Sequence, residues 1–583
     1  MRVIIAHTAG FCMGVRRAMN KAFITMRREE GPIYTHGPLI HNPQVVKLLT
    51  ERGVREIHNA SEASEGTVIL RAHGITPQER KNLKESRLSI VDATCPKVGR
   101  VHAAVRKHHA QGYLVVVVGD RDHPEVVGIV GHTDDTGRVV NTPAEAGELP
   151  DADRVLVVAQ TTFEEGRFCE ILDAIRARYA DGEVKDINTI CQSTMRRQEE
   201  VRNLAEKVDA MVVVGGKNSG NTRRLVEVAV ESGVPAFHIE DSLDLDADAL
   251  GAYRTVGLTA GASTPNWVIM EVADHLSRID RKQRRRIWSL AASMMRFLVL
   301  TSIFASISAG GLATAAAVLM GVNSFYTIPL ISGLLIFTMY VLNRTQDREA
   351  LKFNDPLRES FYTRHKTALS VSGVMTFVVS LFLAFTLSPA AVVLLVAAAL
   401  LGIAYSVKVV PESLERFTKY RRLKDIPASK TFFVAGAWAA IAGAIPYLSA
   451  FDRISFTSFL AVFCLSFLLV FIRAALYDIR DIQGDAVVGR ETIPIVIGKG
   501  WTQRLLVFLT AVVLCVLAAS TAVGLVTSAG WWLLIIPLYT FFVLYLYHRR
   551  VIFQGIVFEL VVDFGFILAG LTSLVWFLCT RPH

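Results

Sequence analysis

The sequence predicts two domains of different fold class: an α/β domain, then an all-α polytopic membrane domain of about nine transmembrane helices. Up to about residue 280, short apolar runs alternate with charged helical patterns. Beyond it, apolar segments of about 20 residues follow one another, which is the length that a bilayer core demands. Because 583 residues exceed what one hydrophobic core organises, we expect boundaries at 1–280, a basic juxtamembrane linker at 281–289, and 290–583.

The linker marks the expected membrane boundary. It carries five cations and then Trp288, a pattern typical of the cytoplasmic side of a membrane, so we expect the N-terminal domain to be cytoplasmic. Residues 281–583 hold 28 Lys and Arg against 14 Asp and Glu, whereas residues 1–280 hold 34 against 39. The excess cations lie in short loops rather than in one patch, which argues against a nucleic-acid partner. The five cations are Arg281, Lys282, Arg284, Arg285 and Arg286.

Seven apolar runs in the first domain predict strands of largely parallel sheets, with helices such as 196–207 and 221–231 between them. Residues whose side chains can bind ligands or take part in catalysis follow the ends of these strands. This is the edge where open α/β sheets bind ligands. We therefore expect these residues to converge on one site. The predicted strands are Val3–Ala6, Val68–Leu70, Ser89–Val91, Leu114–Val118, Val155–Ala159, Met211–Val214 and Thr255–Leu258.

Seven cysteines without a C-x-x-C pair exclude a disulfide framework and a zinc ribbon, and the apolar run at Val3–Ala6 is too short for a secretory signal. Cys12, Cys95 and Cys191 lie in separate strand-end loops, whereas Cys169 falls within a helical pattern, where we expect core packing. Three such thiolates favour a four-iron cluster with one open iron. A zinc site and three unrelated buried thiols remain the alternatives.

A ring of neutral or cationic donors accompanies these cysteines and suits a diphosphate. Glu125 follows His123 by two residues and is the expected proton carrier. A diphosphate-binding module without redox activity is the competing interpretation. The donors are His41, His73, His123, Ser219, Asn221 and Ser263.

The first domain carries an ordered set of motifs, which is similar to that of the LytB family, 4-hydroxy-3-methylbut-2-enyl diphosphate reductase. These are G-F-C-M-G-V at Gly10, I-H-N-P at Ile40, A-H-G at Ala72, D-A-T-C-P at Asp92, H-P-E-V at His123, Q-T-T at Gln160, I-C-Q-S-T-x-x-R-Q at Ile190, K-N-S-x-N at Lys217 and G-A-S-T-P at Gly261. The resemblance implies three pseudo-equivalent lobes around a [4Fe–4S] cluster held by Cys12, Cys95 and Cys191. It also implies two-electron reductive dehydroxylation to isopentenyl and dimethylallyl diphosphates, driven by a donor such as ferredoxin or flavodoxin.

Further roles follow from the same resemblance. The substrate diphosphate is expected on His41, His73, His123, Ser219, Asn221 and Ser263, with Gln160 nearby. Glu125, assisted by Thr161, is expected to deliver protons. One position departs from the family pattern, because Gly220 stands where a second serine is common.

Nine apolar segments are predicted in the second domain, and the cytoplasmic loops between them hold nearly all the cations, as the positive-inside rule requires. Cys464, Cys515 and Cys579 fall inside these segments. The segments lie near residues 290–319, 325–343, 367–387, 389–407, 431–450, 455–476, 503–526, 530–547 and 555–579.

Two of these cytoplasmic loops carry organised acids. Asp478, Asp481 and Asp485 fall on one face of a helical continuation, and Asn343 with Asp347 follows the second segment. Together they are expected to bind Mg²⁺ bridging a diphosphate, although solvated helix ends are the plainer alternative.

Residues from about 290 to 580 resemble the UbiA-like intramembrane prenyltransferases, whose two Asp-rich motifs these acids match. The resemblance implies Mg²⁺-dependent transfer from a prenyl diphosphate to an unknown acceptor that is expected to be aromatic, with Arg422, Lys424 and Lys430 meeting the diphosphate. Leu351 departs from the first motif, where a further aspartate is frequent. A membrane anchor or a transporter-like module is the alternative. Glu559 and Asp563, four residues apart in the last segment, are expected either to bind an acceptor or to tie helices together.

Overall fold

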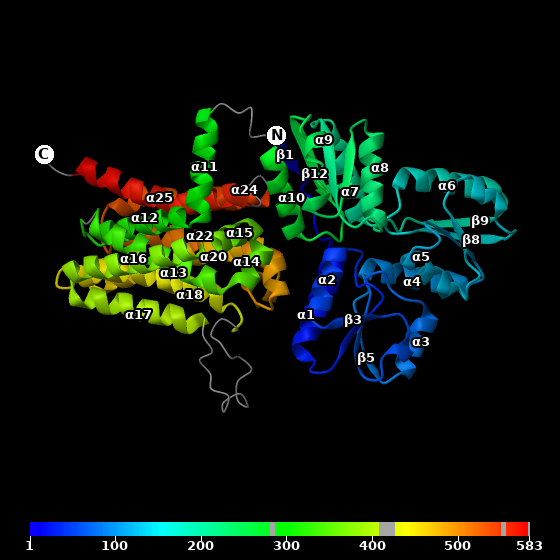
Figure 1. The fold of residues 1–583 in the computed structure, drawn as a ribbon, viewed down its shortest axis with the longest axis horizontal. Coiled ribbons are helices and arrows are strands. Elements are labelled where there is room, and N and C mark those ends of the chain that lie inside the picture. The colour runs from blue at the N-terminus through cyan, green and yellow to red at the C-terminus, as the bar shows by residue number, and fades with distance from the viewer. Residues whose placement is uncertain (280–285, 324, 407–425, 550–554, 581–583) are drawn as a thin grey trace. The chain divides into compact units, whose positions relative to one another are not determined.

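The computed structural model describes residues 1–279, 286–323, 325–406, 426–549 and 555–580. The chain forms two compact units, Met1–Gln283 and Arg284–His583, each of which is described by itself (Figure 1). The predicted basic linker lies largely outside the described residues.

The first unit contains three four-stranded sheets, in which every neighbouring pair of strands is parallel. The first sheet has the order β3 (Val54–Ile57), β2 (Ile33–His36), β4 (Gly66–Leu70), β5 (Leu88–Asp92). The second has the order β7 (Arg138–Val140), β6 (Leu114–Val118), β8 (Arg154–Ala159), β9 (Glu183–Ile187). The third has the order β11 (Ala236–Ile239), β10 (Ala210–Val214), β12 (Thr255–Ala260), β1 (Arg2–Ile5).

The three sheets share one strand pattern, and this confirms the expectation of pseudo-equivalent lobes. In the first two sheets, the strands in chain order lie from one edge to the other as second, first, third and fourth. The third sheet has the same order for β10, β11 and β12, which take the first three places. In the third sheet the N-terminal strand β1 fills that fourth position beside β12. The chain thus closes on itself, and all seven apolar runs predicted as strands coincide with observed strands.

Helices connect the parallel strands, as crossover connections require. They bury apolar side chains against the sheets, for example Phe168 and Ile171 against the valines of β8. Cys169 differs from the expectation, because it is exposed on α6 rather than packed in the core. The helices are α1 (Met13–Arg28), α2 (Pro43–Glu51), α3 (Pro77–Glu85), α4 (Pro96–His109), α5 (Pro124–Val130), α6 (Glu165–Arg178), α7 (Gln192–Ala205), α8 (Gly220–Glu231), α9 (Ala247–Leu250) and α10 (Asn266–Ile279).

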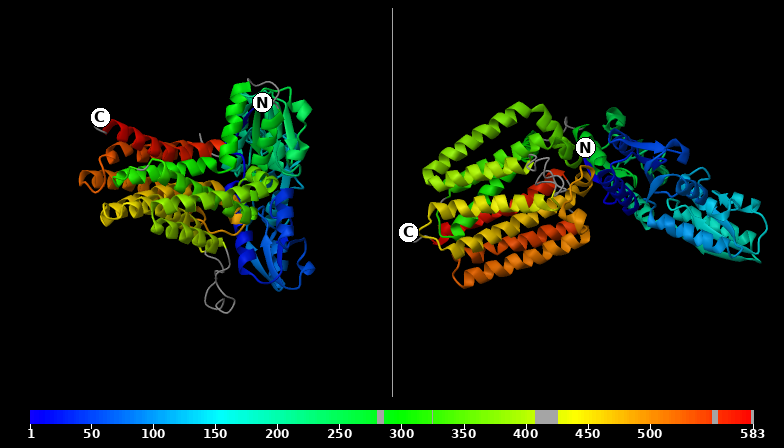
Figure 2. Two further views of the ribbon diagram at one scale, coloured as in Figure 1. Left: turned by 60° about the vertical axis from the view of Figure 1, so that its left-hand side comes forward. Right: turned by 90° about the horizontal axis from the view of Figure 1, so that it is seen from below.

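The second unit is all-helical, with its long helices side by side in a bundle (Figures 1 and 2). Its longest helix, α20, spans 32 residues, and a π-helical turn at Ala440–Ala444 lies between α18 and α19. The helices are α11 (Arg286–Leu300), α12 (Ile303–Leu319), α13 (Thr327–Gln346), α14 (Arg348–Asn354), α15 (Pro356–Arg364), α16 (Lys366–Leu387), α17 (Pro389–Ser406), α18 (Ser429–Ala439), α19 (Ile445–Ser449), α20 (Phe456–Val487), α21 (Ile493–Val496), α22 (Lys499–Ala522), α23 (Ala529–Leu533), α24 (Ile535–His548) and α25 (Gly555–Thr580).

All nine predicted apolar segments coincide with helices, but fewer of them have the length of a membrane span. Among the described residues, seven helices are long and apolar enough to cross a membrane. The helices Leu290–Leu300 and Ile303–Leu319 are bent by 73° to each other, and the number of candidate spans is eight if this pair counts as one span. The apolar helix Pro389–Tyr405 is shorter than the others. The unit is therefore a multi-pass membrane domain with seven or eight candidate spans among the described residues, and the shorter helix Pro389–Tyr405 lies where a further span was expected.

The acids at the end of α20 correct a second expectation. Asp478, Asp481 and Asp485 lie on a helical continuation, as expected, but not in a solvated loop, because α20 continues unbroken to Val487 and all three carboxylates are buried. Buried acids persist in such a helix only where cations or amides pair with them.

Candidate functional sites

The three predicted cluster cysteines occupy equivalent positions in the three lobes. Cys12, Cys95 and Cys191 are the N-terminal caps of α1, α4 and α7, and they follow β1, β5 and β9, the strands in the fourth position of each sheet. The sulfur of Cys12 accepts from the Val15 amide at 3.4 Å. The partial positive charge of a helix N-terminus favours a thiolate, so each lobe presents one cysteine as a ligand.

One cavity joins these cysteines to nearly all of the predicted substrate-binding residues. Besides the cysteines, its lining includes His41, His73, His123, Glu125, Thr161, Ser219, Asn221 and Ser263. The first strand of each lobe leads to His41, His123 or Ser219, and the third leads to His73, Thr161 or Ser263. The predicted convergence at the carboxyl edge of the sheets is therefore present.

The three thiols come from three separate lobes, which suits a cluster as their common ligand. Within the described part of the chain, no group of three His, Cys, Asp or Glu residues is arranged to hold one metal ion. A cluster places its ligands on separate iron atoms and accommodates thiols that stand farther apart. Burial, with smaller contributions from neighbouring Cys12 and Cys191, raises the pKa of Cys95. The donor set itself, three thiols with one from each lobe, fits a [4Fe–4S] cluster.

The three histidines form a compact ring system with unsatisfied polar atoms. The centroid of His41 lies 4.4 Å from that of His73, and His123 lies 5.7 and 5.6 Å from these two. Burial is the first cause that lowers the pKa of all three, to about 4 for His123. His41 Nε2 and His73 Nδ1 are buried without a hydrogen-bond partner among the described residues. Such groups are costly unless a ligand satisfies them.

Asn221 gives the same indication from the third lobe. Both its amide oxygen and its amide nitrogen are buried and lack partners among the described residues. The hydroxyl of Ser263 donates to the carbonyl of His41 at 2.9 Å, which links two walls of the cavity. A bound anion with several oxygens would satisfy the orphaned donors together.

Glu125 lies buried beside Thr161 in this cavity. Its Oε1 accepts from the Thr161 amide at 2.7 Å, and its Oε2 accepts from the Thr161 hydroxyl at 2.9 Å. Burial raises the pKa of Glu125 to about 7, although the two hydrogen bonds from Thr161 oppose this shift. The carboxyl group therefore exchanges a proton near neutral pH, as a general acid requires.

Gln160 stands behind the cavity wall rather than in it. Its Oε1 accepts from the Asp120 amide at 2.9 Å, and its Nε2 donates to the Thr162 hydroxyl at 2.9 Å. With both amide atoms used in this way, Gln160 shapes the loop between β8 and α6.

Gly220 leaves room for the serine that is absent. A Cβ placed there would lie 3.8 Å from Gln160 Nε2 and 3.8 Å from the His123 ring, which are ordinary contacts. We expect Gly220→Ser to add a donor to the anion site and to lower the substrate KM by about 5- to 30-fold, corresponding to roughly 1–2 kcal/mol. Steady-state kinetics measure it, and Gly220→Ala, which adds the Cβ without the hydroxyl, is the control. An equal KM change in both variants would contradict the expectation.

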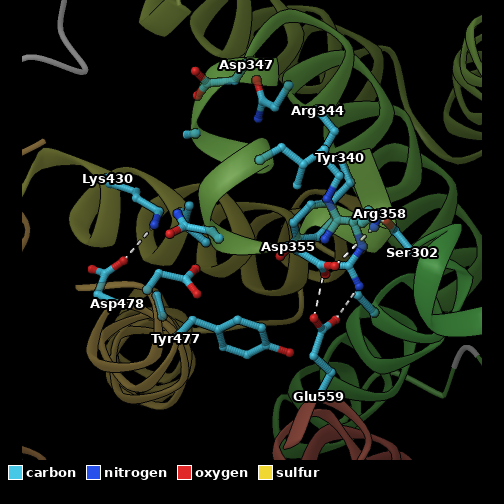
Figure 3. Close-up of a pocket in the computed structure, with 18 of the residues that line it drawn as sticks. Ser302, Tyr340, Arg344, Asp347, Asp355, Arg358, Lys430, Tyr477, Asp478 and Glu559 are labelled. Atoms are coloured by element: carbon cyan, nitrogen blue, oxygen red, sulfur yellow. Dashed lines mark hydrogen bonds and ion pairs between the residues drawn. The ribbon is translucent and has the colours of Figure 1, made fainter. Parts of the chain in front are cut away.

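A second site lies in the helical unit, where charged side chains line a pocket (Figure 3). Asp347, Asp478 and Asp481 line it, with Asn343 and Lys430. Asn343 Oδ1 is buried without a hydrogen-bond partner among the described residues, so it is available to a cation. The predicted residues Arg422 and Lys424 lie outside the described residues.

Lys430 connects two of the predicted acids. Its ammonium group is 2.9 Å from Asp478 Oδ1 (Figure 3) and 3.3 Å from Asp485 Oδ2. Asp485 is fully buried, accepts from Asn354 Nδ2 at 2.9 Å and does not line the pocket. It therefore positions Lys430, while Asp478 and Asp481 line the pocket.

Arginines that sequence patterns did not single out pair with further acids of this pocket. Arg358 forms two hydrogen bonds to Glu559, of 3.0 and 2.7 Å, and Arg480 forms a third of 2.9 Å (Figure 3). Arg480 also forms two hydrogen bonds to Asp481, of 2.7 and 3.2 Å, and Arg490 pairs with Asp347. Arg473 binds Asp563 through two bonds of 2.6 and 2.9 Å. Of the two roles expected for Glu559 and Asp563, the geometry favours tying helices together. Arg473 could have indicated such a buried ion pair in the sequence, because it is a cation inside an apolar segment.

An apolar pocket adjoins the charged one. The two share Tyr340, Asn343 and Tyr405, and the apolar pocket continues along α13, α17 and α18 past Phe432 and Trp438. A ligand with a charged head and a hydrocarbon chain fits this pair of pockets.

Comparison with known proteins gives separate matches for the N-terminal and the C-terminal part of the chain. Residues 3–277 match the family model described as LytB protein, and residues 303–554 match that of the UbiA prenyltransferase family. The 4-hydroxy-3-methylbut-2-enyl diphosphate reductase of Pelobacter propionicus is 45% identical over 282 residues, covering 48% of this chain and 100% of that protein. The enzyme of the same name from Aquifex aeolicus is 43% identical over 284 residues, covering 48% and 98%.

Two solved structures resemble the two halves. That of (E)-4-hydroxy-3-methyl-but-2-enyl diphosphate reductase, the terminal enzyme of the non-mevalonate pathway, is 44% identical, covers 48% of this chain and 99% of its own, and has a TM-score of 0.39. That of a UbiA homologue from Archaeoglobus fulgidus bound to GPP and Mg²⁺ is 15% identical, covers 48% and 98%, and has a TM-score of 0.37.

Proposed function

Since this chain belongs to the LytB protein family through residues 3–277 and carries a UbiA prenyltransferase family domain at residues 303–554, we propose a bifunctional isoprenoid enzyme. The first unit reduces 4-hydroxy-3-methylbut-2-enyl diphosphate to isopentenyl and dimethylallyl diphosphates. The second transfers a prenyl group from a prenyl diphosphate to an acceptor expected to be aromatic. We further propose that the first unit lies in the cytoplasm and the second in the cytoplasmic membrane.

The convergence of three capping cysteines with unsatisfied imidazole and amide groups carries the reductase proposal. A [4Fe–4S] cluster held by Cys12, Cys95 and Cys191 would supply electrons one at a time and an open iron for the substrate hydroxyl. His41, His73 and Asn221 bind the diphosphate through their unsatisfied groups, with Ser219 and Ser263. These contacts with the diphosphate fix the carbon chain of the substrate and point its hydroxyl end toward Glu125.

Glu125 performs the proton step. The reaction consumes two electrons and two protons. The C–O bond of the substrate hydroxyl breaks, one proton leaves with the hydroxyl oxygen as water, and the other forms a new C–H bond on the allylic carbon chain. Protonated Glu125 donates to the departing hydroxyl oxygen, so that it leaves as water rather than hydroxide. The hydroxyl and amide of Thr161 hold the carboxyl group in place and stabilise the carboxylate that remains.

Turnover with the full-length protein tests this proposal. We expect anaerobically purified, iron-loaded protein to be brown and to convert 4-hydroxy-3-methylbut-2-enyl diphosphate with dithionite-reduced methyl viologen as the electron source. Viologen oxidation gives the rate, and product analysis gives both five-carbon diphosphates. Zinc-loaded protein with no viologen oxidation in any preparation would favour the non-redox alternative.

The second activity is supported by acids, cations and an apolar pocket in one place. Asp347, Asp478 and Asp481 would hold Mg²⁺, which would neutralise the charge of the leaving diphosphate. Lys430, whose ammonium group lies between Asp478 and Asp485, supplies a positive charge on the same pocket wall for the diphosphate. The apolar pocket holds the prenyl chain beside the acceptor.

Asp478→Ala is expected to lower Mg²⁺-dependent prenyl transfer by about 10- to 100-fold, because it removes one metal ligand and the main partner of Lys430. Transfer from labelled prenyl diphosphates to a panel of aromatic acceptors in membranes measures the effect. Asp452→Ala is the matched control, since Asp452 lies exposed in the turn after α19. Unchanged transfer by the Asp478 variant would favour the anchor or transporter-like alternative.

A further inference from the structure

A second cavity in the first unit lies among α1, α3 and α4 and is strongly basic. Six of its lining residues are Arg or Lys, and Asp92 is its one lining carboxylate among the described residues. Cys95 lines this basic cavity and also the central cavity, and no other described residue lines both. The wall that holds one cluster cysteine is therefore reachable from outside the substrate site. The six cations are Arg17, Lys21, Arg80, Lys81, Lys84 and Arg106.

Three of these cations hold the approach to Cys95 in place. Arg17 donates to the Thr94 carbonyl at 2.6 Å, and Lys21 donates to the Asp92 carbonyl at 2.5 Å. Arg80 pairs with the Asp92 carboxylate at 2.9 Å and neutralises it. The segment that ends at Cys95 is thus fixed by side chains of the basic cavity.

The other three cations form an exposed rim, with Lys81 and Lys84 on α3 and Arg106 on α4. His102 and His132 complete the wall, with ring centroids 4.5 Å apart. Burial lowers the pKa of His102 to about 4, so this histidine is neutral at neutral pH. The positive charge of the rim therefore comes from lysine and arginine. Such a rim attracts an acidic partner and orients it before contact.

Small residues make the floor accessible. Pro96, Gly99 and Ala103 of α4 line the cavity, and all three are exposed. No atom lies within 4 Å of the position that a Cβ on Gly99 would take. A partner can therefore approach the turn of α4 that begins at Cys95 without meeting a large side chain.

We propose that the basic cavity is the docking surface for a small acidic electron-transfer protein, which passes electrons to the reductase site on its Cys95 side. This inference rests on the proposed reductase function. Two one-electron transfers oxidise two reduced partner molecules, or one partner twice. Together with two protons they reduce one substrate molecule to a five-carbon diphosphate and water. Docking here leaves the substrate cavity free, because the two cavities meet only at Cys95.

A charge-reversal variant tests the docking surface in the full-length, iron-loaded protein. Lys81→Glu, Lys84→Glu and Arg106→Glu together change only exposed rim charges. With a reduced acidic ferredoxin as the probe, we expect the KM for ferredoxin to rise at least about tenfold and its dependence on salt to weaken. With dithionite-reduced methyl viologen, turnover should stay within about twofold of wild type, because viologen needs no docking surface.

Two further variants separate docking from folding. Lys207→Glu reverses an exposed charge outside the cavity and should leave the ferredoxin KM unchanged. Gly99→Trp adds bulk without charge and should impair ferredoxin-driven but not viologen-driven turnover. Titration calorimetry with oxidised ferredoxin supplies a readout other than activity, and the affinity should fall in the triple variant and in Gly99→Trp.

The outcomes distinguish this inference from the function on which it rests. Absence of viologen-driven turnover in the wild type would contradict the reductase proposal itself. Normal viologen turnover, with ferredoxin KM and affinity unchanged by the triple variant, would overturn the docking surface. If the same variant instead loses binding only to vesicles rich in anionic lipid, the rim contacts the membrane and the proposal is wrong.

Discussion

Replacement of Cys95 by alanine is expected to abolish reduction of 4-hydroxy-3-methylbut-2-enyl diphosphate and to remove most of the bound iron. Cys95 caps α4 and is one of only three cysteines on the central cavity among the described residues, one from each lobe. A site left with two thiols cannot ligate three irons of a cluster. We therefore expect the variant to lose the cluster rather than to bind it more weakly. Iron content, the brown absorbance and viologen-driven turnover measure it.

The matched control is Cys169→Ala. Cys169 is exposed on α6, away from the central cavity lining, so its replacement should leave iron content and turnover unchanged. Cys12→Ala and Cys191→Ala should behave like the Cys95 variant, because all three positions are equivalent in the fold. Normal iron and turnover in any one of the three would refute the shared cluster.

Glu125→Gln is expected to lower turnover at least about 10²-fold while substrate still binds. Glutamine keeps the shape and can still accept from the Thr161 amide, but it carries no transferable proton. The KM should therefore change little while kcat falls. Rapid-quench measurement of product, with binding of substrate followed separately, distinguishes this loss from a loss of affinity.

The pH profile gives an independent measure of the same role. Because burial raises the pKa of Glu125 to about 7, the proton-carrying form predominates below pH 7 and disappears above it. Wild-type turnover should fall as pH rises through about 7, and the residual activity of Glu125→Gln should lack this descent. The same shift makes the contribution of Glu125 to folding stability largest below its unfolded pKa and smaller as pH rises through about 7. An unchanged descent in the variant would assign the titration to another group.

Strand prediction found all the central strands except β2, but of the edge strands it found only β1 and β5 and missed β3, β7, β9 and β11. Val68–Leu70, Leu114–Val118 and Met211–Val214 are apolar because the sheet and its helices cover both faces. Edge strands such as β3 and β9 are partly exposed and carry charges at Arg55 or Lys185, so composition did not mark them. Central β2 was missed for another reason, since its four residues contain Thr35 and His36.

The charged pocket of the helical unit shows the opposite limit. The acids were visible in the sequence as motifs, but their cations were not, because Arg358 and Glu559 are 201 residues apart and Arg473 and Asp563 are 90 apart. Local spacing places side chains on one face of a helix and carries no information about which other helix packs there. The expectation that the α20 acids lie in a loop was wrong because buried partners stabilise them within the helix.

The sequence by itself determined the division between a water-soluble α/β unit and a membrane unit, because the length and spacing of apolar runs report the solvent around them. It also determined the residue types at the strand ends, and hence the chemistry available. The tertiary structure alone decided that β1 completes the third sheet beside β12 and so brings Cys12 into one cavity with Cys95 and Cys191. It alone decided that Asp485 supports Lys430 while Asp478 faces the pocket. The physical reason is that pairing between distant segments depends on the free energy of the whole packed unit, which no local pattern contains.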